Sequence, residues 1–213
     1  MENIYENLYQ FTTYIPPMDF TIHQYLLASD PAILFAAGGI KEAQANLPKI
    51  KKILNGRPIK YIFVSHMESD ECGGLPVFLK EYPGVTVLGS ALAARDLPGY
   101  GYTGNITVGS EHELLEDGEL SLRFFDYPAE VHLQNGLVCY EQNSGIFYSA
   151  DLMLSYGNST GKLKKNSWEN AVAAIEARSI PDAEKLADMK KRLLGISPEL
   201  IAVGHGFCIS CAE

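Results

Sequence analysis

Four side chains suited to metal binding follow one short apolar segment of the chain. Residues 61–64 are aromatic and β-branched, which is typical of a buried strand. An imidazole and three carboxylates follow within six positions: His66, Glu68, Asp70 and Glu71. Such closely spaced carboxylates repel one another unless cations lie among them. The cluster therefore predicts a metal site.

The spacing within this cluster favours two metal ions over one. In an extended or turning segment, His66, Glu68 and Asp70 share one face, whereas Glu71 points at another angle. The alternative is a polar strand-to-helix loop, in which the acids stabilise the N-terminus of the helix predicted over 75–82.

Three further candidate ligands lie far along the chain, each after a predicted strand. They are His132, Asp151 and His205. Strand ends that converge on one edge of a sandwich are where ligands from distant segments can be assembled. This recurrence supports a metal site more strongly than the first cluster does alone.

The predicted elements that position these residues alternate between strands and helices in each half of the chain, with mostly strands at the centre. We expect an α/β fold with two sheets face to face and helices outside. A hairpin is predicted over 21–37, and residues 1–20 read as an irregular arm or edge strand. The glycine- and tyrosine-rich segment 98–104 is predicted to be a loop over or near the site.

Composition bounds the remaining possibilities. The 213 residues are 46% hydrophobic and 20% charged, which predicts a single globular domain over 1–213. A net charge of -9 repels phosphate backbones, so we expect no nucleic-acid partner. No signal-type N-terminus or membrane-length apolar run is present, which predicts a cytoplasmic protein without a membrane partner.

The combined motifs resemble the metallo-β-lactamase superfamily, which has a four-layer αβ/βα sandwich fold. Glutamate at position 68, where hydrolases of that superfamily usually have histidine, narrows the resemblance to the flavodiiron branch. The later segments Phe-Tyr-Ser-Ala-Asp151 and Ala-Val-Gly-His205-Gly are similar to the later ligand motifs of that branch. The resemblance covers residues 20 to 207.

The resemblance implies a ligand set for each of two iron ions. His66, Glu68 and His132 would hold one iron, Asp70 and His205 the other, and Asp151 would bridge them. Mixed imidazole and carboxylate ligation agrees with iron, and zinc and manganese are the alternatives.

Two departures from the flavodiiron pattern shape the functional prediction. The histidine that follows the aspartate in that branch is Glu71 here, which would ligate, leave the position to water, or turn outward. We also expect no flavin bound by this chain alone, because no flavodoxin-like phosphate loop is present. The chain thus resembles stand-alone oxygen-binding diiron proteins.

The resemblance implies a non-haem diiron protein. It would bind dioxygen as a sensor or carrier, or act as an oxidoreductase on dioxygen or nitric oxide with electrons from a separate protein. A signalling partner and a homodimer are also implied. The competing class is a binuclear zinc hydrolase, in which a metal-bound hydroxide attacks a carbonyl. A metal-free interaction module fits poorly with six intact ligand positions.

Several other residues have plainer interpretations. His23 is predicted to be a hydrogen-bonded core histidine or a residue beside the site, and His112 to lie in a solvated turn. The four cysteines, Cys72, Cys139, Cys208 and Cys211, are predicted to be free thiols.

Overall fold

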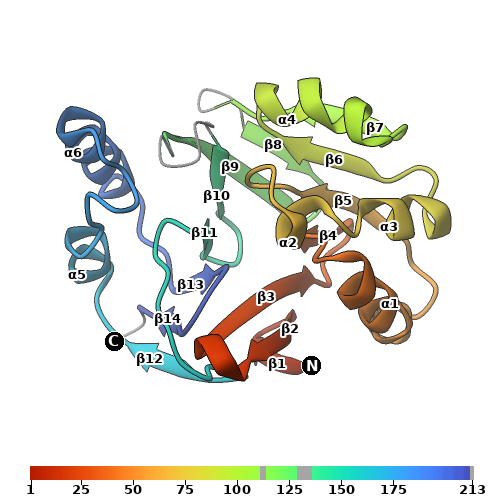
Figure 1. Ribbon diagram of the computed structural model, residues 1–213, viewed down its shortest axis with the longest axis horizontal. Coiled ribbons are helices and arrows are strands. Elements are labelled where there is room, and N and C mark those ends of the chain that lie inside the picture. Colours follow the sequence, from red (N-terminus) through yellow and green to blue (C-terminus); the bar gives the residue numbers. More distant parts are fainter. Residues whose placement is uncertain (111–113, 129–135, 212–213) are drawn as a thin grey trace.

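Two seven-stranded sheets pack face to face at the centre of the protein (Figure 1). The computed structural model describes residues 1–110, 114–128 and 136–211. The first sheet runs, in spatial order, β1 (Glu2–Tyr5), β2 (Leu8–Ile15), β3 (Phe20–Leu27), β4 (Ala32–Phe35), β5 (Ile59–Phe63), β6 (Thr86–Gly89) and β7 (Asn105–Val108). The second runs β12 (Leu163–Lys165), β14 (Cys208–Ser210), β13 (Leu200–Val203), β11 (Ile146–Ala150), β10 (Gly136–Glu141), β9 (Leu120–Tyr127) and β8 (Leu114–Asp117).

Helices cover the outer face of each sheet (Figure 1). The first sheet carries α1 (Ile40–Leu54), α3 (Leu75–Glu81) and α4 (Ala91–Asp96), and the second carries α5 (Trp168–Ala173) and α6 (Ala183–Leu193). Short turns of helix occur at η1 (Pro16–Met18), α2 (Ser69–Cys72) and η2 (Leu97–Tyr100). The layers are therefore helix, sheet, sheet, helix, which is the αβ/βα sandwich that the sequence predicts.

Aromatic side chains from both sheets fill the space between them. Phe63 on β5 stacks on Phe124 of β9 with ring centroids 6.2 Å apart, and Phe35 on β4 lies 5.4 Å from Tyr148 of β11. All four side chains are almost completely buried, and burial of an aromatic ring of this size contributes about 2–3 kcal/mol. These two aromatic contacts hold the two sheets together beneath the strand ends that carry the predicted ligands.

The strand ends bring ligands from distant segments together. Strands β11 and β13 are parallel neighbours, with Ala150 opposite Val203, so the residues that follow them emerge side by side. Asp151 comes directly after β11, and His205 comes two residues after β13. The backbone N–H of Gly204 donates to the carbonyl of Ala150 at 2.9 Å, which ties the two loops at their start.

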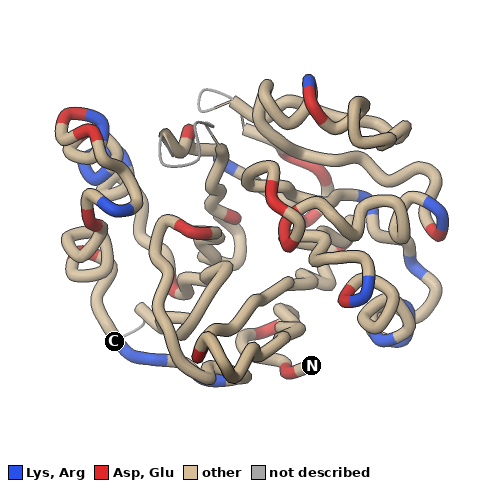
Figure 2. The backbone as a smooth tube through the Cα atoms, viewed as in Figure 1, with Lys and Arg blue, Asp and Glu red and all other residues tan. Residues whose placement is uncertain are grey.

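Acidic residues gather in the middle of the molecule. Figure 2 shows them around α2 and at the end of β11, whereas lysines and arginines lie mainly on outer helices such as α1 and α6. The acidic centre therefore lies between the two halves of the sandwich. Within the described ranges, none of the helices is both long and apolar enough to cross a lipid bilayer.

Candidate metal centre

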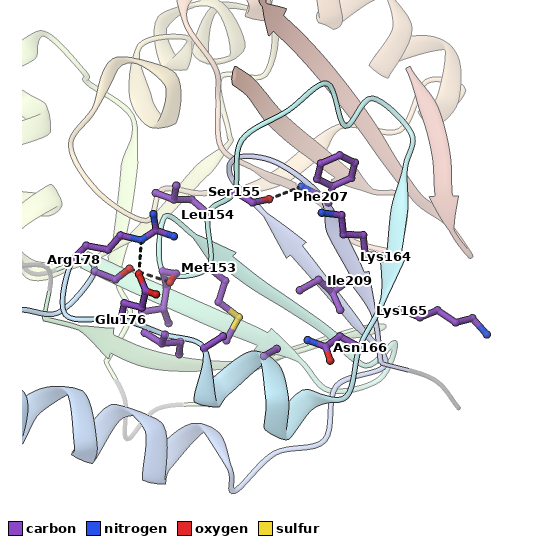
Figure 3. Close-up of a pocket in the computed structure, with 15 residues that line it drawn as sticks. Met153, Leu154, Ser155, Lys164, Lys165, Asn166, Glu176, Arg178, Phe207 and Ile209 are labelled. Atoms are coloured by element: carbon purple, nitrogen blue, oxygen red, sulfur yellow. Dashed lines mark hydrogen bonds and ion pairs between the residues drawn. The ribbon is translucent and has the colours of Figure 1, made fainter. Parts of the chain in front are cut away.

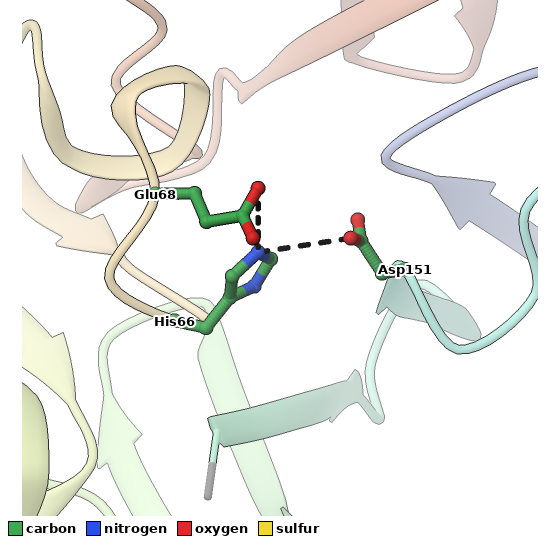
Figure 4. Close-up of side chains that lie close together, drawn as sticks. All are labelled: His66, Glu68 and Asp151. Carbon is green, nitrogen blue, oxygen red and sulfur yellow. Dashed lines mark ion pairs between the residues drawn. The ribbon is translucent and has the colours of Figure 1, made fainter. Parts of the chain in front are cut away.

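Three predicted ligands converge at the centre of the molecule (Figure 4). His66 and Glu68 come from the loop after β5, and Asp151 comes from the end of β11. The Nε2 atom of His66 lies 3.9 Å from a carboxylate oxygen of Glu68 and 3.7 Å from Oδ2 of Asp151. One ligand atom of each residue lies within 4.8 Å of the other two, which is close enough for one metal ion.

A second pair of predicted ligands meets the other side of Asp151. The Nε2 atom of His205 lies 3.1 Å from Oδ1 of Asp151 and 3.4 Å from Oδ2 of Asp70. The two oxygens of Asp151 therefore face two different histidines, His66 through Oδ2 and His205 through Oδ1. A carboxylate in this orientation can bind two cations at once.

The ring of His205 is held in place from the first sheet. Its Nδ1 atom lies 3.0 Å from the carbonyl oxygen of Thr21 on β3. A carbonyl only accepts, so Nδ1 carries the hydrogen and Nε2 keeps its lone pair for a metal. The ring of Phe20 stacks on the imidazole at 4.4 Å. The sequence analysis missed both residues. Thr21 lies 184 positions before His205 in the chain, so no local pattern connects the two segments.

His23 supports the turn that carries His205. Its Nε2 atom lies 2.8 Å from the carbonyl oxygen of Gly206, and its Nδ1 atom lies 2.8 Å from the hydroxyl of Thr12. Burial lowers the pKa of His23 to about 4, although the Gly206 carbonyl favours the proton, so the ring is neutral at pH 7. His23 is thus a hydrogen-bonded core histidine that also lies beside the site, which agrees with the sequence-based interpretation.

The carboxylate of Glu71 is directed between the two sheets. One oxygen accepts from the backbone N–H of Ser65 at 3.1 Å, and the other accepts from the phenol of Tyr148 at 2.6 Å. Burial raises the pKa of Glu71 to about 7, although His66 and these hydrogen bonds act in the opposite direction. Each carboxylate oxygen of Glu71 already accepts a hydrogen bond from the protein. The group of closely spaced ligand atoms consists of His66, Glu68 and Asp151 and does not include Glu71. Coordination by Glu71 stays a prediction.

The local conformation differs from an extended segment. Glu68 has extended backbone angles, but Ser69–Cys72 form the short helix α2. The side chains of Asp70 and Glu71 therefore leave a helical turn in different directions, Asp70 toward His205 and Glu71 toward Tyr148. The prediction that Glu71 points away from the other ligands agrees with this geometry.

The charges of the site fit a bound cation. Burial would lower the pKa of His66, but the carboxylates of Glu68, Glu71 and Asp151 outweigh it and raise that pKa to about 9. Burial also raises the pKa of Asp70, against the effect of His205. The raised pKa values of His66 and Asp70 mean that these side chains retain protons to a higher pH than usual. Metal ions are the alternative counter-charge, and this donor set of imidazole nitrogens and carboxylate oxygens suits iron, manganese or zinc.

The predicted loop over 98–104 lies beside Glu68. Tyr100 and Tyr102 line a cavity of about 300 Å³ together with Met67, Glu68 and Cys72. Glu68 is the one member of the group His66, Glu68 and Asp151 that lines this cavity, so the cavity adjoins the site at Glu68.

The remaining predicted residues divide into two groups. His132, which is predicted to be the third histidine ligand, and His112 lie outside the described residues. All four cysteines are free thiols, as predicted. Cys208 is buried on β14, where its sulfur lies 3.0 Å from the phenol oxygen of Tyr25, and the thiol of Cys72 donates to the carbonyl of Glu68 at 3.1 Å.

An αβ/βα sandwich with histidine and carboxylate side chains at the inner strand ends is the arrangement of the metallo-β-lactamase fold. A family model described as "ODP family beta lactamase" matches residues 20–206, which is most of the chain. The chain belongs to this family, and the predicted resemblance to the flavodiiron branch is confirmed.

Known relatives agree with this assignment. A protein described as diflavin flavoprotein A 2 from Nostoc sp. is 25% identical over 205 residues, which covers 87% of this chain and 33% of the relative. A Synechocystis sp. protein of the same description is 23% identical with the same coverage. The chain therefore spans about a third of the length of the curated relatives it matches.

Solved structures share the fold. The rubredoxin oxygen:oxidoreductase of Desulfovibrio gigas has a TM-score of 0.77 at 17% identity and covers 98% of this chain and 57% of its own. A mutant flavo di-iron protein from Thermotoga maritima has a TM-score of 0.70 at 22% identity, covering 90% of this chain and 50% of its own. At these identities, the similarity defines the fold of the sandwich.

Proposed function

We propose that this chain is a non-haem diiron protein that binds dioxygen, as a sensor or carrier, or reduces dioxygen or nitric oxide with electrons from a separate protein. One observation carries the proposal: the carboxylate of Asp151 lies between His66 and His205 and turns a different oxygen to each. The names of the structurally similar proteins, among them a flavo di-iron protein and a rubredoxin oxygen:oxidoreductase, support iron and dioxygen.

In this proposal each ion has its own ligands. His66, Glu68 and His132 would hold one iron, Asp70 and His205 would hold the other, and Asp151 would contribute to both. When bound, an iron pair supplies reversible electron transfer and open positions for a diatomic ligand.

The chain's own residues prepare these positions. The carbonyl of Thr21 fixes the tautomer of His205 so that Nε2 faces the site, and the stacked ring of Phe20 limits rotation of the imidazole. On the other side, the phenol of Tyr148 and the N–H of Ser65 hold the carboxylate of Glu71. These contacts pre-organise the side chains of His205 and Glu71, because each of the two is fixed by other groups of the protein.

The acid at position 68 separates this proposal from the zinc-hydrolase alternative. A glutamate in place of a neutral imidazole adds a negative charge beside His66. Added negative charge makes a metal-bound water harder to deprotonate, which disfavours hydroxide attack on a carbonyl. The same charge stabilises ferric over ferrous iron, as oxygen chemistry requires.

Metal analysis after anaerobic purification tests the proposal. We expect about two iron atoms per chain, and a visible absorption band when the ferrous protein meets air. Asp151→Asn should lower the iron content by half or more, whereas the matched change Asp188→Asn, at an exposed position on α6, should leave it unchanged. Two zinc atoms per chain with ester hydrolysis, and no response to dioxygen, would support the hydrolase instead.

An oxygen electrode then separates carrier from reductase. The protein is reduced with dithionite, and the reductant is removed before the protein is mixed with dioxygen. A carrier then takes up about one dioxygen per iron pair and stops. A reductase consumes dioxygen continuously once a small electron-transfer protein is added. Light scattering on the same preparation measures the molar mass and so tests the homodimer that the resemblance implies.

A further inference from the structure

A second cavity lies behind the loop that follows Asp151 (Figure 3). Its volume is about 380 Å³, and its walls come from residues 152–155, strands β12 and β14, and helix α5 with the segment after it. Cavities of this size hold small organic molecules. None of the predicted metal ligands within the described residues lines this cavity, so it is a different binding place.

The floor of the cavity is apolar. Leu152, Ala171 and Ile175 are buried lining residues, and the partly buried side chains of Met153 and Ile209 pack against the same core. A ligand that rests on this floor removes apolar surface from water, which favours a compact hydrocarbon or aromatic body.

The rim of the cavity is positively charged, against the overall charge of the protein. The chain has 17 lysine and arginine residues and 26 aspartate and glutamate residues, yet Lys164, Lys165 and Arg178 line this cavity with a single acid, Glu176. Arg178 already pairs with Glu176 at 3.3 Å, and Lys165 extends away from the other lining residues (Figure 3). The charge that a ligand would meet is therefore the ammonium of Lys164.

Lys164 is held at the edge of the cavity by an aromatic ring. Its Nζ atom lies 3.9 Å from the centroid of Phe207, and Figure 3 shows the two side chains together at one end of the site. Among the described residues, no carboxylate lies within ion-pair distance of Lys164. The backbone N–H of Phe207 donates to the hydroxyl of Ser155 at 3.1 Å, which fixes the segment that carries the ring. The ammonium is thus positioned for an anion.

We propose that this cavity binds a small amphipathic carboxylate. The carboxylate pairs with the ammonium of Lys164 at the Phe207 end, and the apolar body lies along Met153 and Ile209 toward Ile175. An ammonium forms a charge-assisted hydrogen bond with a carboxylate, so charge complementarity selects an acid over a neutral molecule of the same shape. The site needs no metal, and it does not depend on the proposed diiron function.

Binding of 2-naphthoate and of its neutral isostere 2-naphthamide tests the proposal. Titrations followed by calorimetry use the purified full chain, both as isolated and after treatment with a chelator. We expect 2-naphthoate to bind once per chain with a Kd of roughly 0.1 to 1 mM in both preparations. The amide should bind about tenfold more weakly or not at all. Binding that disappears with the chelator would place the carboxylate on the metal and overturn the proposal.

Two pairs of variants locate the site. Lys164→Gln should weaken 2-naphthoate about tenfold, and Lys165→Gln, at the neighbouring lysine that extends away, should change its Kd less than twofold. Ala174→Trp places a large ring at an exposed lining position and should abolish binding, whereas Ala173→Trp, exposed on the same helix and absent from the lining, should leave it intact. Both tryptophan variants are checked for wild-type unfolding temperature.

Three results would overturn the inference. They are equal affinity for acid and amide, equal effects of the two lysine variants, and unchanged binding in Ala174→Trp. Failure of the wild-type protein to bind the carboxylate would also overturn it. If Ala174→Trp then changed the oligomeric state, the cavity would instead receive a second copy of the chain.

Discussion

The metal-free protein should lose stability as the pH rises from 7 to 9. The cause is His66, whose pKa in the folded chain is raised to about 9 from an ordinary value of 6.5 by the carboxylates of Glu68, Glu71 and Asp151, which outweigh burial. A base with a raised folded pKa stabilises the fold fully below its unfolded pKa. That stabilisation is lost as the pH rises through the pKa of His66 in the folded state, so the free energy of unfolding decreases from pH 7 to pH 9.

The size of the effect follows from the two pKa values. A shift from 6.5 to about 9 corresponds to about 3 kcal/mol at roughly 1.4 kcal/mol per pKa unit, of which about 2 kcal/mol is lost between pH 7 and pH 9. His205, whose pKa is also raised, adds to the same slope, with burial opposing Asp151 and Asp70. For a domain of this length the unfolding temperature should fall by roughly 4 to 8 °C across this window.

Urea and thermal unfolding of the chelator-treated protein measure this slope. His66→Gln removes the titrating group and should leave only the part that comes from His205. His23→Gln is the matched control, since the pKa of His23 is lowered to about 4 and the ring stays neutral from pH 7 to 9. That variant should be less stable at every pH in the window with an unchanged slope. A wild-type stability that is flat or rises from pH 7 to 9 would refute the reasoning.

Three further outcomes follow from the structure. Tyr148→Phe removes the donor to the buried carboxylate of Glu71 and should cost about 1–3 kcal/mol in urea unfolding; no loss would mean that water replaces the phenol. Gly206→Ala should prevent folding to a metal-binding form, because φ is +89° and a Cβ would overlap the backbone oxygen of Ser155, whereas Gly84→Ala meets no atom within 4 Å and should behave as wild type in circular dichroism. Restoring iron to the chelator-treated protein should raise its unfolding free energy by about 4 kcal/mol at a thousandfold excess over Kd, and an unchanged value would contradict metal binding to the folded state.

Local patterns predict the strands that carry the ligands. The apolar run at 59–64 becomes β5, and the hairpin predicted over 21–37 becomes β3 and β4, because alternation and β-branched residues report burial directly. Helical spacing also predicts helices over 167–177 and 181–194, and these segments contain α5 and α6. The convergence of His66, Asp151 and His205 could be anticipated because each follows a strand whose end the pattern defines.

Long-range contacts could not be predicted in the same way. The first twenty residues read as an irregular arm or edge strand, and β1 is an edge strand, but β2 lies inside the sheet, where it pairs with β3 along eight residues and places Thr12 opposite His23. The exposed edge strands β7 and β12 carry little apolar periodicity, and their pairing depends on partners elsewhere in the sheets. Backbone groups such as the carbonyl of Thr21 are chemically identical along the chain, so no sequence signal marks the one that orients His205.

The direction of Glu71 depends on a short helix that the sequence hides. The spacing predicts that Glu71 points at another angle than the other ligands but does not give its partner, and α2 turns it toward Tyr148, 77 positions away. The partner phenol lies on a strand of the other sheet, so only the assembled sandwich reveals the pair.

Anomalous diffraction at the iron edge, from crystals of the iron-loaded protein, tests the central claim most directly. The account predicts two iron peaks about 3–4 Å apart, with one oxygen of Asp151 on each, His66 on one and His205 on the other. A single peak, or two peaks with both oxygens of Asp151 on the same ion, would contradict it.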